Sequence, residues 1–275
     1  MFLKSLIKLI FLLFSTTLFA LEHNPHQGGV AVIELKEFIK KPKVFFQSNE
    51  VKVLEKEGKY FAVIGIGIDE KVGKKHIVAV NQNKKVSLYF NVTKKSYKKE
   101  YIKLKTNKRV TLSKENLQRF KKEKAKSTKV LKSFNKTLSS NLEFISPLNG
   151  RISSTYGKRR YYNNKPKSPH KGIDIATKRG TSIVASESGV VKIAQEFFFN
   201  GNTIYLDHGE GVITMYAHMK GFEVGEGDFV EKGEVIGYVG TTGRSTGPHL
   251  HFGIMLNAKA VDPGIFVADY RNKSK

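Results

Sequence analysis

Short apolar runs separated by polar clusters dominate the chain from residue 29 to about residue 105. These runs are rich in β-branched and aromatic residues, and clusters of Lys, Asn and Gly separate them, which is typical of strands and turns. The pattern predicts a small all-β domain, which we assign to residues 21–105. The predicted strands are GVAVIEL (29–35), KVFFQ (43–47), KYFAVIGIGI (59–68), HIVAVN (76–81) and VSLYFNV (86–92).

After Ser113, apolar residues recur at the spacing of a helix and no longer in the short runs of strands. Ser113 itself can cap the first turn of this helix. We predict a helix over residues 114–138, inside a linker at 106–141 that packs a narrow apolar stripe on a neighbouring domain. Most other positions are Lys, so the alternative is a basic amphipathic helix in weak contact with an anionic membrane surface. The stripe comprises Leu117, Phe120, Leu131, Phe134 and Leu138, close to multiples of 3.6 residues.

A second series of short strands, separated by frequent glycines, fills residues 142–264. Dense glycine suits tight turns between antiparallel strands, so we predict a second antiparallel β domain here. The chain is therefore expected to be mostly β, with a helix between two β domains. Residues 265–275 should form a C-terminal tail, whose last residues, YRNKSK (270–275), should be solvated. The strands expected are TSIVASESGVVKIA (181–194), NTIYLDH (202–208), VITMYAH (212–218), EVIGYVG (234–240) and LHFGIML (250–256).

The first twenty residues indicate where in the cell the protein is located. Lys4 and Lys8 precede an apolar run from Leu9 to Phe14, and Ala20 ends the segment, which predicts a cleaved signal peptide at 1–20. The alternative is an uncleaved membrane anchor, but the run is short for a span, which needs about 20 apolar residues. We therefore expect an exported protein with no stable transmembrane span after cleavage.

The net charge of the chain limits the classes of partner, and its cysteine content limits the source of its stability. The 275 residues include 48 Lys and Arg against 24 Asp and Glu, a formal net charge of +24, which favours a polyanionic partner. Export makes nucleic acid an unsuitable partner, and no zinc-finger spacing or aromatic-rich basic stretch is present. Because the chain has no cysteine, its stability has to come from packed cores rather than disulfides.

Two histidines stand two residues apart in the segment TGPHLHFGI (246–254). Alternate residues of a strand point to the same face, so His249 and His251 should project together, about 7 Å apart along the backbone. Leu250 and Phe252 should then point into a core. This arrangement favours a functional site over two unrelated structural histidines.

Three further candidates occur in the same domain. His170 and Asp174 lie in SPHKGIDIA, where an extended backbone would put both side chains on one face, and His218 ends the strand VITMYAH. Imidazole and carboxylate groups are zinc ligands, and catalytic zinc sites use three of them with a fourth position for water. His170, Asp174 and either His249 or His251 could supply the three ligands. The remaining histidines would then handle protons or stabilise an oxyanion.

The motifs HKGID, YAHM and HLH, in this order, resemble the M23 (lysostaphin/LytM-like) zinc peptidases. The surrounding segments GRISSTYGKRR, GIDIATKRGTSIVASESGVV and GDFVEKGEVIGYVGTTGRSTGPHLHF are similar as well, and the resemblance covers about residues 144–262. It implies a LytM-like antiparallel β domain with one Zn²⁺ per chain. It also implies that His170, Asp174 and His251 are the zinc ligands, and that His218 and His249 are the catalytic pair.

The resemblance also implies a function. We expect a zinc-dependent DD-endopeptidase that cleaves stem-peptide cross-links of peptidoglycan in the periplasm, during cell-wall remodelling and in control of cell shape. DD-carboxypeptidase activity is a second expectation. The alternative is a non-catalytic LytM-type regulator that binds and activates a wall amidase. A further hypothesis is that the residues before 142 cover the active site and restrain its activity.

Overall fold

The computed structural model describes residues 21–82, 84–102, 113–166 and 168–271. The predicted signal peptide at 1–20 lies outside the described residues, as do residues 103–112 of the predicted linker. None of the helices within the described ranges is both long and apolar enough to cross a membrane.

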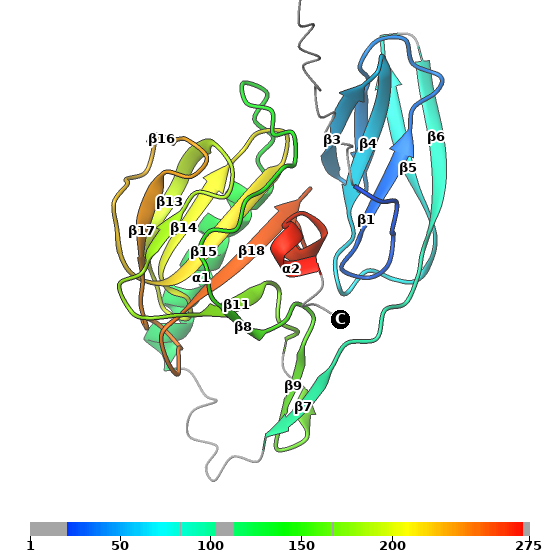
Figure 1. Cartoon of the computed structure of the whole chain (residues 1–275). Coiled ribbons are helices and arrows are strands. Elements are labelled where there is room, and N and C mark those ends of the chain that lie inside the picture. The colour runs from blue at the N-terminus through cyan, green and yellow to red at the C-terminus, as the bar shows by residue number, and fades with distance from the viewer. Residues whose placement is uncertain (1–20, 83, 103–112, 167, 272–275) are drawn as a thin grey trace, which may run out of the picture.

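The first β region folds as a six-stranded antiparallel sheet in the order β1-β4-β3-β2-β5-β6, which we call the N-terminal sheet. It forms the right-hand part of the molecule in Figure 1. The predicted all-β character of this region is confirmed, and its strands share a core that includes Phe46, Ile64 and Ile77. The strands are β1 (Val30–Glu34), β2 (Lys43–Phe46), β3 (Asn49–Lys56), β4 (Lys59–Gly65), β5 (Gly73–Asn81) and β6 (Lys84–Val92).

The second β region is a ten-stranded antiparallel sheet whose main order is β16-β13-β14-β15-β18-β11-β8, which we call the C-terminal sheet. Its core is continuous with Val30, Val63 and Ile68 of the first β region. The strands are β8 (Arg151–Ser154), β11 (Ile173–Ala176), β12 (Ser182–Val184), β13 (Gly189–Phe197), β14 (Gly201–Asp207), β15 (Val212–Phe222), β16 (Phe229–Val230), β17 (Val235–Val239), β18 (His249–Leu256) and β19 (Lys259–Val261).

A small third sheet connects the two regions. Strand β7 (Lys99–Ile102) follows the N-terminal sheet in the chain and pairs in parallel with β9 (Arg159–Tyr162). Strand β9 in turn forms a hairpin with β10 (Lys165–Pro166). The β9–β10 hairpin lies just before His170 in the chain. The segment that follows the N-terminal sheet therefore helps to hold the polypeptide that leads into the predicted site.

The helix between the two regions is present but shorter than predicted. Helix α1 runs from Lys114 to Leu131, and Ser113 is its N-cap, as expected, because its hydroxyl accepts from the backbone N–H of Asn116. The predicted end at residue 138 is wrong: Lys132 is the C-cap. The next residues leave the helix and bind the turn between β14 and β15, where Asn135 O accepts from Glu210 N–H.

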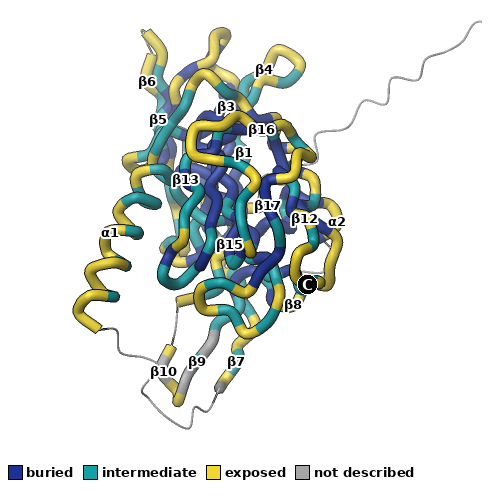
Figure 2. The backbone as a smooth tube through the Cα atoms, turned by 90° about the vertical axis from the view of Figure 1, so that its left-hand side faces the viewer, coloured by how far each residue is buried: buried dark blue, intermediate teal, exposed yellow. Residues whose placement is uncertain are grey.

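The outer face of α1 is largely solvent-exposed, as Figure 2 shows. Leu117, expected in the apolar stripe, is 41% exposed, while Phe120 packs edge-on against Phe199 at 5.0 Å between ring centroids. The result is a mostly antiparallel β protein with two β regions and a helix between them, which confirms the predicted fold class.

The C-terminal residues correct one prediction. The prediction that the tail is solvated from Tyr270 is wrong at that residue, because the chain forms a 3₁₀ turn η1 (Pro263–Ile265) and a short helix α2 (Ala268–Arg271) that packs on the domain. Val267 and Tyr270 are buried, and the Tyr270 hydroxyl bonds to Ser146. Burial of two large side chains keeps this segment on the C-terminal sheet.

Candidate metal centre and catalytic histidines

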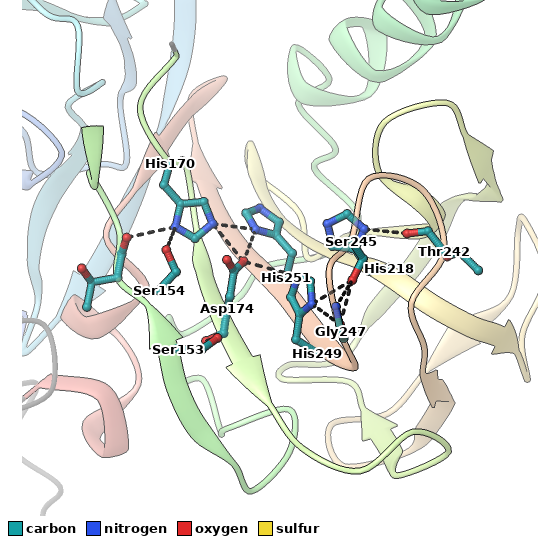
Figure 3. A network of polar contacts seen from close by, with 11 residues as sticks. Ser153, Ser154, His170, Asp174, His218, Thr242, Ser245, Gly247, His249 and His251 are labelled. Atoms are coloured by element: carbon teal, nitrogen blue, oxygen red, sulfur yellow. Dashed lines mark hydrogen bonds and ion pairs between the residues drawn. The ribbon is translucent and has the colours of Figure 1, made fainter. Parts of the chain in front are cut away.

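Three of the predicted site residues meet at one point on the C-terminal sheet. His170 Nε2, Asp174 Oδ1 and His251 Nδ1 lie 2.9 Å from one another in each of the three pairings. Figure 3 shows these side chains pointing toward one another, with His249 and His218 farther along the same row. The three donor atoms therefore form a compact triangle with the residue types that bind zinc.

The pairing of β11 with β18 explains why these residues meet. Asp174 stands directly opposite His251 in the antiparallel register. Ile173 and Phe252, on the opposite faces of the same strands, are fully buried, so the apolar alternation fixes which face carries the polar groups. As predicted, His249 and His251 share a face while Leu250 points into the core.

His170 reaches the site from a loop and not, as predicted, from an extended strand. Strand β11 begins only at Ile173, and the turn before it contains Gly172. A Cβ atom at Gly172 would lie 2.4 Å from the carbonyl oxygen of Phe252 and 2.9 Å from the His251 ring. Only glycine allows this close approach, so the turn that delivers His170 depends on it.

A backbone hydrogen bond orients the ring of His170. Its Nδ1 lies 2.9 Å from the carbonyl oxygen of Thr155, and a carbonyl only accepts, so Nδ1 is the donor. The other ring nitrogen, Nε2, therefore faces the Asp174 carboxylate and the His251 ring. Two imidazole nitrogens and one carboxylate oxygen that converge in this way are ligand types that zinc binds. The donor set therefore fits a divalent metal ion of the zinc type.

Burial and the neighbouring imidazoles shift the pKa of Asp174 in opposite directions. Burial alone would raise the pKa of its carboxyl, but the rings of His170 and His251 outweigh burial and hold that pKa well below its usual range. The pKa of His251 is lowered, chiefly by burial. Both groups are therefore in the unprotonated form that metal binding requires near pH 7.

His218 and His249 form a second pair beside the triangle. Their ring centroids are 4.8 Å apart, and His249 Nε2 lies 4.0 Å from Asp174 Oδ1. His218 Nδ1 donates to Thr242 O at 2.9 Å, and His249 Nδ1 donates to Gly247 O at 2.8 Å. Each ring is therefore oriented through Nδ1, which leaves its Nε2 available for proton transfer.

The backbone at His218 differs from the prediction. His218 does not end a strand, because β15 continues to Phe222, and its φ is +64°. Strand β15 carries one more residue than β14 between the pairs Ile204–Tyr216 and Asn202–Met219, so a bulge breaks the alternation here. A regular strand would have placed His218 on the face of the fully buried Tyr216.

Burial lowers the pKa of His218 to about 4, so the side chain is neutral near pH 7. Its backbone is fixed as well, because His218 N–H donates to Asn200 O at 2.8 Å. A neutral, oriented imidazole with a bare Nε2 is suited to general base catalysis.

Sequence reasoning missed the residues that orient these rings. The carbonyl groups of Thr155, Thr242 and Gly247 each fix one imidazole, and Ser245 Oγ lies 3.2 Å from His249 Nδ1. A backbone carbonyl has no residue-type signature, so no sequence pattern could have identified these contacts.

The first β region lies beside the site at its His170 end. Asp69 is 3.7 Å from Lys171, the residue after His170. Within the described residues, the hydrogen bonds and ion pairs of the five site residues are made with residues after 142. The five side chains are partly accessible, with 13–15% exposure for the four whose ion pairs join Asp174 to the histidines.

Two family descriptions match this chain. Residues 168–263 match Peptidase family M23, and residues 23–95 match the Peptidase family M23 N-terminal domain. A Pseudomonas aeruginosa crystal structure assigned to peptidase M23 is 35% identical, with a TM-score of 0.76 over 90% of this chain and 96% of the other. The chain belongs to peptidase family M23. The shared architecture therefore extends over both β regions and not only over the part that carries the site motifs.

Curated M23 relatives share the site region. The DD-carboxypeptidase/endopeptidase Mpg of Neisseria meningitidis is 44% identical over 113 residues, and the peptidoglycan DD-endopeptidase ShyA of Vibrio cholerae is 37% identical over 113 residues. Each match covers 41% of this chain and 26% of the relative. The chain thus spans about a quarter of the length of these relatives.

Proposed function

We propose that this M23 chain is a zinc-dependent peptidoglycan DD-endopeptidase with additional DD-carboxypeptidase activity. The observation that carries the proposal is the triangle of His170, Asp174 and His251, whose donor atoms lie 2.9 Å apart and are of the types that bind zinc. A non-catalytic regulator has no need of this donor set or of the oriented histidine pair beside it.

In this proposal, one Zn²⁺ per chain is held by His170 Nε2, Asp174 Oδ1 and His251 Nδ1. Bound there, zinc would supply Lewis-acid polarisation of the scissile carbonyl and activation of water. The Nδ1 atoms of His218 and His249 are engaged by carbonyl oxygens, so their Nε2 atoms remain for catalysis next to the triangle. We assign the pair to proton transfer: one ring accepts the proton of the attacking water at Nε2, and the imidazolium formed there gives that proton to the leaving amine. The other ring, when protonated at Nε2, would stabilise the developing oxyanion.

The substrate class follows from the relatives and from charge. The relatives named above are DD-endopeptidases or act as DD-carboxypeptidase/endopeptidase, and the net charge of +24 complements a carboxylate-bearing wall polymer. We propose that residues 1–20 export the chain to the periplasm, where it acts in wall remodelling and cell shape. We also propose the division into residues 21–105, a linker at 106–141 and a peptidase domain at 142–264, with weak contact between the basic face of α1 and anionic membrane surfaces.

The test is digestion of purified sacculi by the mature chain, followed by separation of the released muropeptides. We expect cross-linked dimers to be converted to monomers. His218→Ala should keep its metal but lose about 10²–10⁴ in rate, because positioned acid–base groups contribute factors of that size.

A mutant of an exposed histidine serves as the control. His23→Ala changes an exposed side chain in the first β region and should digest sacculi like the parent chain. Unchanged dimers with the parent chain, combined with restored wall splitting by an added amidase, would support the regulator and reject the peptidase.

A further inference from the structure

Arg244 is an exposed cation held in a fixed place beside the catalytic pair. Its guanidinium carbon lies 4.2 Å from the centroid of the Phe199 ring and 5.9 Å from that of Phe198. Its backbone N–H donates to Phe199 O at 2.8 Å, so main chain and side chain are both anchored on the turn between β13 and β14. Stacking on an aromatic face restricts the guanidinium while leaving its edge and five N–H donors available.

The turn that carries Phe199 is itself held rigidly by α1. Glu123 accepts from the Phe198 N–H with both carboxylate oxygens, at 3.1 and 3.0 Å, and Phe120 packs against Phe199. The platform under Arg244 is therefore fixed from two sides, which reduces the entropy lost when the guanidinium binds a ligand.

The carboxylates near this turn are already paired with another residue. Arg119 forms ion pairs with Glu123 at 2.7 Å and with Glu196 at 3.7 Å. Within the described residues, Arg244 makes its aromatic stacking contacts and its backbone hydrogen bond, and no carboxylate oxygen lies within 4 Å of its guanidinium. An exposed, oriented arginine without an acidic partner is suited to binding an anionic group of a ligand.

Arg244 also lies in the loop that orients both catalytic histidines. Two residues before it, Thr242 O accepts from His218 Nδ1, and the next residue, Ser245, contacts His249 Nδ1. Figure 3 shows Thr242 and Ser245 at the His218 and His249 end of the row. Arg244 therefore lies in the chain between the two residues that contact the catalytic pair.

We propose that Arg244 is a specificity residue that binds the carboxylate on the carbon bearing the scissile amide nitrogen. This assignment rests on the proposed function. In a cross-link to diaminopimelate, the carbon that carries this nitrogen also carries a carboxylate, and in a terminal D-alanyl-D-alanine the same is true of the last residue. One arginine would therefore serve both the endopeptidase and the carboxypeptidase reactions, and would select against substrates in which this carboxylate is amidated.

The test compares two pairs of defined substrates. One pair is a muropeptide dimer with the diaminopimelate carboxylate free or amidated, and the other is a pentapeptide ending in D-alanyl-D-alanine or in its carboxamide. We expect the parent enzyme to prefer the free carboxylate by about 10-fold or more in kcat/KM, chiefly through KM. In Arg244→Gln, the ratio of the two kcat/KM values should fall to about 1, and Arg244→Lys should recover part of it.

Controls separate this role from a structural one. Zinc content should be equal in the parent and in Arg244→Gln, and Arg179→Gln, at another exposed arginine, should keep the parent ratio. A parent enzyme that cleaves both members of each pair equally would overturn the assignment, as would an Arg244→Gln variant that loses rate on both members by the same factor. Cleavage of neither pair by the parent would reject the proposed function itself.

Discussion

Residues of one type have different chemistry here because their surroundings differ. His170 and His251 face a carboxylate, and His218 keeps a bare nitrogen, whereas His208 is fully buried with both ring nitrogens engaged by Ser188 O and Thr214 Oγ1 at 2.8 Å. His208 lies in the core of the C-terminal sheet and outside the site. His208 has a structural role that is sensitive to acid.

Burial lowers the pKa of His208 to about 4, against 6.5 for the free side chain. Between these two pH values the unfolded chain takes up a proton that the folded chain does not, so stability is complete above pH 6.5 and is lost toward pH 4. This shift corresponds to roughly 3 kcal/mol. In urea unfolding with a chelator present, His208→Gln should lose less free energy of unfolding than the parent from pH 7.5 to pH 4.5. Identical losses in the two proteins would contradict this assignment.

At the level of elements, alternation predicted the strands well because each buries one face. Strand β18 is the clearest case, since Leu250 and Phe252 fixed the direction of His249 and His251. The bulge at His218 and the loop position of His170 could not be predicted, because contacts with β14 and with the β9–β10 segment decide them. The end of α1 at Leu131 depends likewise on the pairing of Asn135 with Glu210 and not on helix period.

Helix α1 supports the site through the turn between β13 and β14. Glu123 binds the Phe198 N–H, and Asn200 of the same turn holds His218. Glu123→Ala leaves that N–H without its acceptor and should reduce the free energy of unfolding by about 2 kcal/mol. Amide exchange at Phe198 and His218 should accelerate in parallel. Glu123→Gln keeps an acceptor oxygen and should lose less than half as much. Equal effects of the two substitutions would show that the hydrogen bond has no such role.

At the scale of the whole molecule, a buried ion pair joins the two β regions. Lys52 of β3 is 2% exposed and lies 2.5 Å from Glu210, in the turn between β14 and β15, and Lys41 binds the other oxygen of Glu210. Burial lowers the pKa of Lys52 despite the opposing effect of Glu210. Asn257 adds a second connection, because its side chain bonds to both backbone groups of Gly65. The two regions are therefore fixed together by polar groups as well as by a shared core.

Removal of one member of the buried ion pair should lower the free energy of unfolding substantially. Glu210→Gln leaves the Lys52 charge buried without compensation, and we expect a loss of about 3–5 kcal/mol in the free energy of unfolding. The double variant Lys52→Met with Glu210→Gln should recover part of that loss. Lys41→Met, at a side chain that is 45% exposed, should change stability by less than about 1 kcal/mol. Chemical denaturation of the four proteins measures these values, and a Glu210→Gln variant as stable as the parent would be inconsistent with the bridge.

The most direct measurement is the zinc content of the purified mature chain after zinc loading and desalting, determined by atomic emission for the parent and for single variants. The account predicts about one zinc per parent chain, retention in His208→Gln and His218→Ala, and loss in His170→Ala, Asp174→Ala and His251→Ala. A parent chain without stoichiometric metal, or an Asp174→Ala chain that keeps its full complement, would contradict it.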